Sequence, residues 1–489
     1  MPSTGDLGHF DPMELREIHA NAPQMFVDDY LVENRFDANM LSATVPHAAH
    51  SPERRPDPVL RPDRPWEHEN GLGYPGVVFD GEKRRYRLYY SVYHKTTQGK
   101  PDYPPGGYFL CYAESEDGIH WEKPDLGLIP WGEQRETNIV LQGECEANLP
   151  HVHAAEAGED GGPKNIGTVP ARFLRGHRFV LYYNDMGHYL ATSDDGIHWR
   201  ERAHRVIPNR IDCLHTMVYD EERDVFVSFL RNKLIFGGRI APPELRGNTR
   251  AISRLSNPDW WTTWDGIPAS VLIPDQGDAK RFYGMPTFRY GGVYWGMLQQ
   301  FDEDPQTIEV ELVFSRNGID WKHLPGRPRL IPVGEPGTWD GGMVISGDRV
   351  IEQGDEWRIY YTGYVGHHNA EKNCGSIGFS TIRKEGFASI RSGENEGFVL
   401  TRPLRWPGGR LFVNADASRG MIRARVTDLR RQTIDGFDYP DCEPFQGDGV
   451  RHPVSWKGGS LVDFQGRIIR LEFRLRNADL YAFVAGDKG

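Results

Sequence analysis

One seven-residue pattern occurs three times in this chain and limits what the chain can fold into. Residues 115–121 read SEDGIHW, residues 193–199 read SDDGIHW and residues 315–321 read SRNGIDW. Self-similar segments at a long period are typical of repeat architectures, in which one supersecondary unit recurs. Weaker copies lie at residues 256–261 and 380–387. The irregularly spaced anchors of the five copies are Trp121, Trp199, Trp261, Trp321 and Phe387.

Each copy of the motif has a structural interpretation as a strand, a tight turn and a packing residue. An apolar run before it, such as GYFLCYAES, predicts a strand. The Asp-Gly or Asn-Gly pair then makes a tight turn, because both positions tolerate positive φ. The Ile and Trp that follow begin the next strand and can pack between neighbouring sheets. We therefore interpret the motif as a turn and packing anchor that reports the fold and performs no chemistry.

The segments between the anchors predict an all-β fold. Each contains an apolar strand, an aromatic strand and the strand that enters the motif, with the alternation of half-buried strands. Five such sheets with no helical stretch predict a five-bladed β-propeller over residues 71–395. Residues 396–489 are rich in strands but lack the motif, and we expect a β-sandwich there. The Pro-rich residues 1–70 are expected to form an extended leader packed on the propeller.

The composition of the chain limits which kinds of partner the protein can bind. The formal net charge of −12 argues against nucleic acid, which requires a basic face. No stretch is long and apolar enough for a membrane span, and the polar N-terminus has no apolar core of a signal peptide. Five scattered cysteines have no metal-binding spacing, which favours reduced thiols. We expect a cytoplasmic protein without a membrane or nucleic-acid partner, and a homo-oligomer is compatible with the sequence.

Two stretches and the order of domains resemble a known family. FVDDYLVE (26–33) and DGIHWEKPDLGL (117–128), together with five blades and a C-terminal sandwich, resemble the five-bladed β-propeller glycoside hydrolases. This superfamily includes invertase, levansucrase and arabinanase (families 32, 68 and 43), and the two stretches are similar to a bacterial branch near family 32. The resemblance covers most of the chain. It implies a glycosidase with carboxylates at the axial funnel, and it allows calcium near the axis.

Glycoside cleavage needs two carboxyl groups beside the bond, so acids near the inner strands are the catalytic candidates. The Asp, Asp and Glu motifs of the family are absent from their usual places. Glu69 precedes the first inner strand, Asp212 the third and Asp340 the fifth, while Glu309 lies on a later strand of the fourth blade, on one face with Glu311. We expect Asp212 and Asp340 to face each other across the funnel from half-exposed positions.

Other residues are candidates for binding the sugar. Arg231 ends a second strand and can hold hydroxyls or a carboxylate through its planar fork. Aromatic rings stack on sugars, and polar side chains at the rim accept sugar hydroxyls. The remaining binding candidates are Tyr74, Asp185, His215 and Trp339. The His367-His368 pair could ligate calcium, and otherwise no cofactor is expected.

Three functions remain open at this stage. The first is a glycoside hydrolase acting on a small oligosaccharide or glycoside, such as a fructoside or arabinoside. The second is a non-catalytic carbohydrate-binding propeller. The third is a sugar lyase on the same scaffold, in which His188, His215 and Tyr74 would replace paired acids. Two carboxylates facing one cavity favour hydrolysis, and scattered acids favour binding.

Overall fold

The computed structural model describes residues 14–37, 45–143, 147–155, 162–207, 215–233, 235–236, 239–240, 250–279, 281–371 and 373–487. Within these ranges the regular structure consists of β-strands and short 3₁₀ helices, which confirms the all-β class. Two compact units divide the chain. The smaller contains Met1–His50, Leu324–Gly326 and Arg383–Gly489, and the larger contains Ser51–His323 and Arg327–Ile382. Among the described residues, no helix is long or apolar enough to span a membrane.

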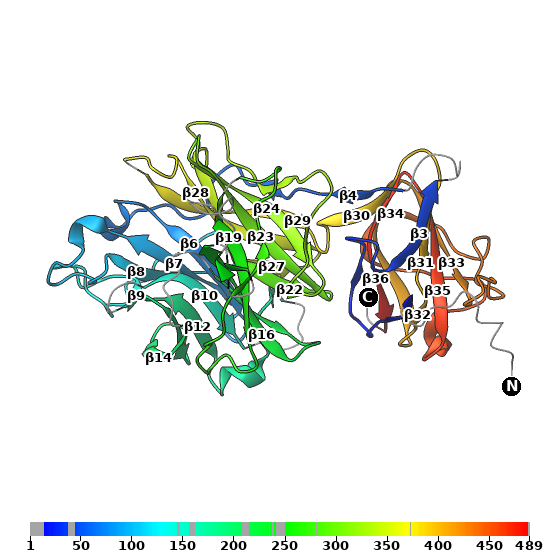
Figure 1. Ribbon diagram of the computed structural model, residues 1–489, viewed down its shortest axis with the longest axis horizontal. Coiled ribbons are helices and arrows are strands. Elements are labelled where there is room, and N and C mark those ends of the chain that lie inside the picture. The colour runs from blue at the N-terminus through cyan, green and yellow to red at the C-terminus, as the bar shows by residue number, and fades with distance from the viewer. Residues whose placement is uncertain are drawn as a thin grey trace. The chain divides into compact units, whose positions relative to one another are not determined.

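The strands of the larger unit follow one another as five antiparallel meanders within the described ranges, and the third and fourth are joined into one sheet by a parallel pair between Arg250 and Arg281 (Figure 1). The first is β6 (Gly73–Asp80), β7 (Arg85–Tyr93), β8 (Tyr108–Ser115) and β9 (Ile139–Gln142). The second is β10 (Asn148–Ala154), β12 (Phe179–Asn184), β13 (His188–Ser193) and β14 (Arg200–Ile207). The third is β15 (Met217–Asp220), β16 (Val225–Lys233), β19 (Arg250–Asn257) and β20 (Ala269–Leu272).

The fourth and fifth meanders gain short extra strands. The fourth is β22 (Thr287–Tyr290), β23 (Val293–Asp302), β24 (Thr307–Ser315), β25 (Trp321–His323) and β26 (Arg329–Ile331), with β21 (Arg281–Gly284) also paired to β23. The fifth is β11 (Lys164–Ile166), β27 (Met343–Gln353), β28 (Glu356–Tyr364), β29 (Gly375–Arg383) and β5 (Glu53–Arg54). The remaining elements are the β17 (Ile235–Phe236) and β18 (Arg239–Ile240) hairpin and the helices η3 (Pro65–Glu67), η4 (Lys95–Thr97) and η5 (Ala171–Leu174).

Apolar clusters join consecutive meanders into a closed ring. Each cluster takes side chains from two neighbours, and the last one joins the fifth meander to the first. One residue pair represents each cluster: Tyr89 with Phe179, Leu190 with Phe226, Phe229 with Tyr294, Phe301 with Tyr364, and Tyr360 with Leu88. Among the first strands, β27 contacts β6 and β22, β6 contacts β10, and β15 contacts β22. This arrangement is of the propeller type that the repeats predict.

The repeated motif docks each turn onto the preceding meander. Gly118 and Gly196 have φ of +73° and +75°, which an L-residue adopts at a cost. The Tyr89 hydroxyl of the first meander donates to the Gly196 carbonyl of the second at 2.7 Å. The Tyr360 hydroxyl of the fifth meander donates to the Gly118 carbonyl of the first at 2.8 Å. At these two interfaces the glycine turn of one meander is therefore held by a tyrosine hydroxyl of the meander before it.

The four tryptophan anchors occupy equivalent places, as predicted. Trp199 lies 5.6 Å from Tyr89 of the first meander, measured between ring centroids. The other three also contact the meander that precedes them in the ring: Trp121 with Tyr360, Trp261 with the Phe173 carbonyl, and Trp321 with Phe229. The fifth anchor differs, because Phe387 is buried in the smaller unit. The turn of the first meander docks on the fifth, through Tyr360 and Trp121.

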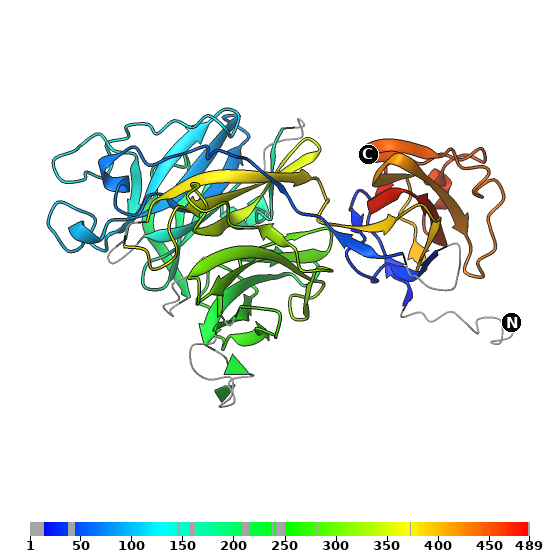
Figure 2. The ribbon, with the colours of Figure 1, turned by 90° about the horizontal axis from the view of Figure 1, so that it is seen from above.

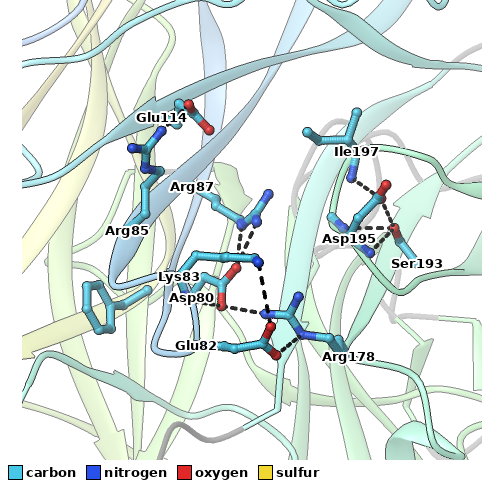
Figure 3. Close-up of polar contacts among 12 residues, drawn as sticks. Asp80, Glu82, Lys83, Arg85, Arg87, Glu114, Arg178, Ser193, Asp195 and Ile197 are labelled. Atoms are coloured by element: carbon cyan, nitrogen blue, oxygen red, sulfur yellow. Dashed lines mark hydrogen bonds and ion pairs between the residues drawn. The ribbon is translucent and has the colours of Figure 1, made fainter.

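Ion pairs reinforce the interface between the first two meanders (Figure 3). Asp80 ends β6 and is buried, with its Oδ2 accepting from Arg87 Nε at 2.9 Å and Nη2 at 2.7 Å. Its Oδ1 accepts from Nη2 of Arg178, just before β12, at 2.7 Å. Glu82 lies 3.0 Å from Arg178 Nε. The buried carboxylate is thus satisfied by both meanders, as buried charges must be.

The smaller unit includes the beginning of the chain. Its strands are β1 (Arg16–Glu17), β2 (Gln24–Met25), β3 (Val32–Asp37), β4 (His47–Ala49), β30 (Ala388–Ser392), β31 (Gly397–Thr401), β32 (Leu404–Arg405), β33 (Arg410–Thr427), β34 (Phe445–Pro453), β35 (Ile468–Arg476) and β36 (Ala478–Gly486), with helix η7 (Leu461–Phe464). In Figures 1 and 2 the dark-blue strands lie among the orange and red ones of this unit. The β-sandwich expected for residues 396–489 stays a prediction.

The leader expected for residues 1–70 is divided differently. Strand β3 pairs with β31, and β4 pairs with β30, so both belong to the smaller unit. Only the later part joins the larger unit, where β5 pairs with β29 and Trp66 is buried. The reason is backbone pairing: an edge strand with unpaired N–H and C=O groups recruits any extended segment within reach.

Candidate functional site

Side chains from all five meanders meet at the end of the ring where the first strands begin. Tyr74 and Tyr283 pack against the apolar cluster that contains Phe301 and Tyr364. Arg231, at the end of β16, donates from Nη1 to the Tyr283 carbonyl at 3.4 Å. Side chains from all five meanders can lie close together only near the axis of the ring, so this is an axial site. We call it the axial cluster: Tyr74, His188, His215, Arg231, Arg250, Tyr283, Tyr364 and His368.

Tyr74 has an unusual backbone conformation for a bulky residue. Its φ is +48°, in the left-handed region that only glycine enters freely. The β6–β7 register shifts between Gly73 and Gly76, so the strand bulges at this residue. A Cβ on Gly73 would lie 3.0 Å from the Tyr364 hydroxyl. Bulges and strained residues concentrate at functional sites, where they direct a side chain.

Two buried histidines form the floor of the cluster. The backbone N–H of Arg231 donates to His215 Nε2 at 3.3 Å. That nitrogen therefore accepts, so the proton is on His215 Nδ1, which lies 3.4 Å from His188 Nε2. Burial lowers the pKa of His188 to about 3, and burial with nearby His188 holds the pKa of His215 well below its usual range. Both rings are neutral at pH 7.

Two guanidinium groups lie over one aromatic ring. Arg231 Cζ is 5.5 Å from the centroid of Tyr283, and Arg250 Cζ is 6.0 Å from it. Burial, followed by the charge of Arg250, lowers the pKa of Arg231 to about 10. His368 Nε2 lies 3.2 Å from the Tyr283 hydroxyl, completing an aromatic and cationic rim. Such a surface suits a polar ligand with an apolar face, as a sugar has.

Asp340 lies in a structural ion pair. Its Oδ2 accepts from Arg54 Nη1 and from the Tyr361 hydroxyl, each at 2.9 Å, and its Oδ1 accepts from Thr338 at 3.1 Å. The residue is 1% exposed, in contrast to the half-exposed rim position that we expected. Neighbouring Trp339 is also buried, stacks on Tyr361 and donates from Nε1 to the Pro56 carbonyl at 2.9 Å. Both side chains hold the N-terminal segment of the larger unit against its fifth meander.

Glu309 faces a different cavity. It lines a cleft of about 390 Å³ with Asp278 and Gln300, and that lining has no residue in common with the axial cluster. Its Oε2 accepts from Arg329 Nε at 3.1 Å, and Arg329 Nη1 also donates to Glu311 at 2.9 Å. The shared arginine confirms that Glu309 and Glu311 lie on one strand face.

The remaining candidates lie at the surface, in the interior or outside the described residues. Glu69 accepts from the backbone and hydroxyl of Thr96 at 3.1 and 3.0 Å and lies 3.0 Å from His94 Nδ1. Asp185 is buried directly after β12. Asp212 lies outside the described residues. Within the described ranges, no hydrogen bond or ion pair joins Asp185, Glu69, Glu309 or Asp340 to one another.

Two groups have donor atoms of the kind that bind metals. His368, which we considered for calcium, has Nδ1 3.1 Å from Asn369 Oδ1 and Nε2 near Tyr283. Asp275, Asp278 and His323 bring ligand atoms within 4.8 Å of one another. Arg327 donates to Asp275 at 2.9 and 3.0 Å and lies 3.4 Å from Asp278. A guanidinium therefore already supplies positive charge to both carboxylates.

The sequence interpretation missed three members of the axial cluster. Arg250, Tyr283 and Tyr364 lie at the ends of strands β19, β21 and β28, at the same edge as Arg231. The sequence contained a usable signal for these residues. In an antiparallel meander, the start of the first strand, the end of the second strand and the start of the third strand all lie at the same edge of the sheet. Applying this rule to every blade would have selected Arg250 and Tyr364.

Comparison with known proteins finds distant similarity. No protein-family model matches this chain. Two uncharacterized proteins of Mycobacterium tuberculosis, from strains CDC 1551 / Oshkosh and ATCC 25618 / H37Rv, are 27% identical over 138 residues. The match covers 27% of this chain and 34% of each relative, so the chain spans about a third of their length.

Solved structures are similar over longer ranges. An N-acetylgalactosamine deacetylase from F. plautii is 18% identical and is matched over 69% of this chain and 96% of its own, with a TM-score of 0.45. The catalytic domain of the Coprinopsis cinerea GH62 alpha-L-arabinofuranosidase is 13% identical, with coverages of 68% and 97% and a TM-score of 0.40. A family 43 arabinoxylan arabinofuranohydrolase from Bacillus subtilis is 12% identical, with coverages of 88% and 99% and a TM-score of 0.37.

Proposed function

We propose that this protein is a glycoside hydrolase that binds a small oligosaccharide or glycoside at the axial cluster. The observation that carries the proposal is the convergence of aromatic, guanidinium and imidazole groups from all five meanders at one end of the axis. Tyr74, Arg231, Arg250, Tyr283 and His368 are partly exposed, so a ligand can reach them, and the buried histidines lie beneath.

The two catalytic carboxyl groups that we propose are Asp212 and Asp185. Asp185 precedes His188 in the chain as Asp212 precedes His215, at the same spacing. His215 Nδ1 and His188 Nε2, on the histidines that follow the two acids in the chain, are 3.4 Å apart. One acid would protonate the leaving oxygen, and the other would act as nucleophile or base.

Each binding residue has a role in this proposal. Arg231 and Arg250 would hold polar groups of the substrate, and Tyr74 and Tyr283 would contact the apolar face of a sugar ring. His215 would position Arg231 through the backbone bond to its Nε2 rather than remove a proton, since both of its nitrogens are engaged. The same engagement disfavours a lyase that uses His215 as its base. We propose no cofactor for the reaction.

A panel of aryl furanosides and pyranosides tests the proposal with the whole chain. We expect hydrolysis of at least one class, and kcat lower by at least about 10²-fold in both Asp212→Asn and Asp185→Asn, the size of a lost acid or base. The matched control is Glu356→Gln, at an exposed position in the β27–β28 hairpin. Binding of a sugar without turnover of any glycoside would instead make the protein a carbohydrate-binding propeller.

A further inference from the structure

A buried group of polar side chains lies among the inner strands of the ring. The register of β27 against β28 shifts at a bulge that carries Asp348 and Arg349, which are 1% and 2% exposed. Arg349 Nη2 donates to the carbonyl of Val152 on β10, and Asp348 Oδ1 accepts from the backbone N–H of Val77 on β6 at 3.3 Å. The bulge of the fifth meander therefore contacts the inner strands of both the first and the second.

Two histidines of β10 face this bulge. His151 and His153 alternate with Val152 along the strand, so their side chains lie on one face, and their ring centroids are 4.3 Å apart. His151 Nδ1 lies 3.7 Å from Asp348 Oδ2. Burial and the nearby charge of Arg349 hold the pKa of both histidines well below its usual range, so both rings are neutral at pH 7.

Several polar atoms of this group have no partner. Within the ranges that the structure describes, no hydrogen bond reaches Nη1 of Arg349, Nε2 of His153 or either ring nitrogen of His151. The backbone N–H of Val169 donates to His153 Nδ1 at 3.2 Å, so the proton of His153 is on Nε2. Two N–H groups of Nη1 and one from each histidine make four donors, against one acceptor on the neutral His151. Buried polar groups are ordinarily paired, so this excess of donors points to a ligand.

We propose that a small monovalent anion such as chloride binds between Arg349 Nη1, His153 Nε2 and His151. Chloride accepts from several N–H groups at once, whereas a water molecule brings O–H donors of its own, for which this group has little acceptor capacity. The carboxylate of Asp348 is already held, because its Oδ2 accepts from Arg349 Nε and Nη2 at 3.0 Å each. The remaining N–H groups of the guanidinium are therefore left for a second anion, in a charge-assisted hydrogen bond.

A proton balances the charge of the bound anion. An anion added to the Asp348–Arg349 pair leaves one buried charge uncompensated, which is costly. His151 can take up one proton, because its Nδ1 faces Asp348 Oδ2 at 3.7 Å and its Nε2 lies in the same buried group. As an imidazolium it would donate to both Asp348 and the anion. Among the described residues, the other titratable or charged groups that face it are Arg349 and His153.

Anomalous diffraction from crystals of the full chain grown in sodium bromide locates the anion directly, since bromide takes the place of chloride and scatters anomalously. We expect an anomalous peak within hydrogen-bonding distance of Arg349 Nη1 and His153 Nε2. The absence of a peak there, with or without density for a water molecule, overturns the proposal. The site shares no residue with the axial cluster, so this experiment does not depend on whether a glycoside is cleaved.

Thermal unfolding measures the affinity in solution, with sodium gluconate at equal ionic strength as the reference salt. Chloride at a tenfold excess over Kd should raise the midpoint of the larger unit by about 2 °C, and the rise should saturate. The half-saturating chloride concentration should be at least about 10-fold lower at pH 6 than at pH 8, because binding takes up a proton. Equal midpoints in the two salts overturn the site, and equal affinities at the two pH values overturn the role of His151.

His151→Leu removes the proposed proton acceptor. It also removes two unpartnered buried polar atoms, so it should not lower the midpoint in gluconate, but the rise with chloride should be lost. The matched control is His68→Leu, at an exposed position before the first inner strand, which should keep the chloride response. A full chloride response in His151→Leu overturns the role of His151. If this variant does not fold, the bromide experiment on the unaltered chain decides.

Discussion

Gly196→Ala should weaken the interface between the first two meanders. Gly196 has φ of +75°, and an L-residue in that region costs about 1–2 kcal/mol. A Cβ there would also lie 2.8 Å from the Tyr89 hydroxyl and 3.0 Å from Arg87 Nη1. Neither atom can yield freely, since Tyr89 donates to the Gly196 carbonyl and Arg87 is held by buried Asp80. Overpacking of this kind adds about 1–3 kcal/mol.

The total expected loss is therefore about 2–5 kcal/mol in the free energy of unfolding of the larger unit. Gly354→Ala separates the two contributions. Gly354 has φ of +60° but no atom within 4 Å of the added Cβ, so it has the backbone cost alone. Urea denaturation followed by tryptophan fluorescence measures both variants, with the transition of the larger unit fitted separately because two units need not unfold together.

The difference between Gly196→Ala and Gly354→Ala is the quantity that tests the explanation of the motif. We expect about 1–3 kcal/mol, which is the overpacking cost by itself. Equal losses in the two variants would refute the idea that docking on Tyr89 and Arg87 requires a glycine. The repeated motif would then be explained by turn conformation within each meander and not by the interface.

Three further predictions concern acid stability, metals and Asp340. Burial acts to raise the pKa of Asp195, but hydrogen bonds from the His198 side chain and from the backbone N–H groups of His198 and Ile197 outweigh it, so the pKa lies well below its usual range. A lowered folded pKa stabilises the protein above the unfolded value of about 3.9, and the stabilisation is lost as the pH falls below that value. Asp195→Asn should flatten the fall in urea midpoint below about pH 4, and an unchanged slope would contradict the pKa assignment. Chelation with EDTA should leave hydrolysis and the thermal midpoint unchanged because Arg327 already neutralises Asp275 and Asp278, whereas a calcium-dependent rise in the midpoint would reveal a metal site. Asp340→Asn should destabilise the larger unit by about 1.5–3 kcal/mol through loss of a charged hydrogen bond to Arg54, with kcat little changed, and a hundredfold loss of kcat at unaltered urea stability would restore Asp340 as a catalytic acid.

Local features of the sequence determined the repeat and its turns. The Asp-Gly pairs at 117–118 and 195–196 predict turns with positive φ, and the glycines have φ of +73° and +75°. These predictions succeed because a tight turn depends on the φ preferences of two adjacent residues and needs no distant partner. Strand alternation also depends only on near neighbours, so the all-β class followed from the sequence. The four tryptophan anchors were identified from the repeated motif, in which each of them follows the turn.

Only the tertiary structure decided which charged residues meet. Asp340 and its partner Arg54 are 286 positions apart in the chain, so a sequence pattern around either one contains no trace of the other. The same holds for Arg250 and Arg231, which lie on neighbouring strands but share the ring of Tyr283 from the next meander. The pairing of β3 with β31 placed the beginning of the chain in the smaller unit. Non-local pairing depends on which strand edges remain open after folding, and that is a property of the assembled sheets rather than of any one segment.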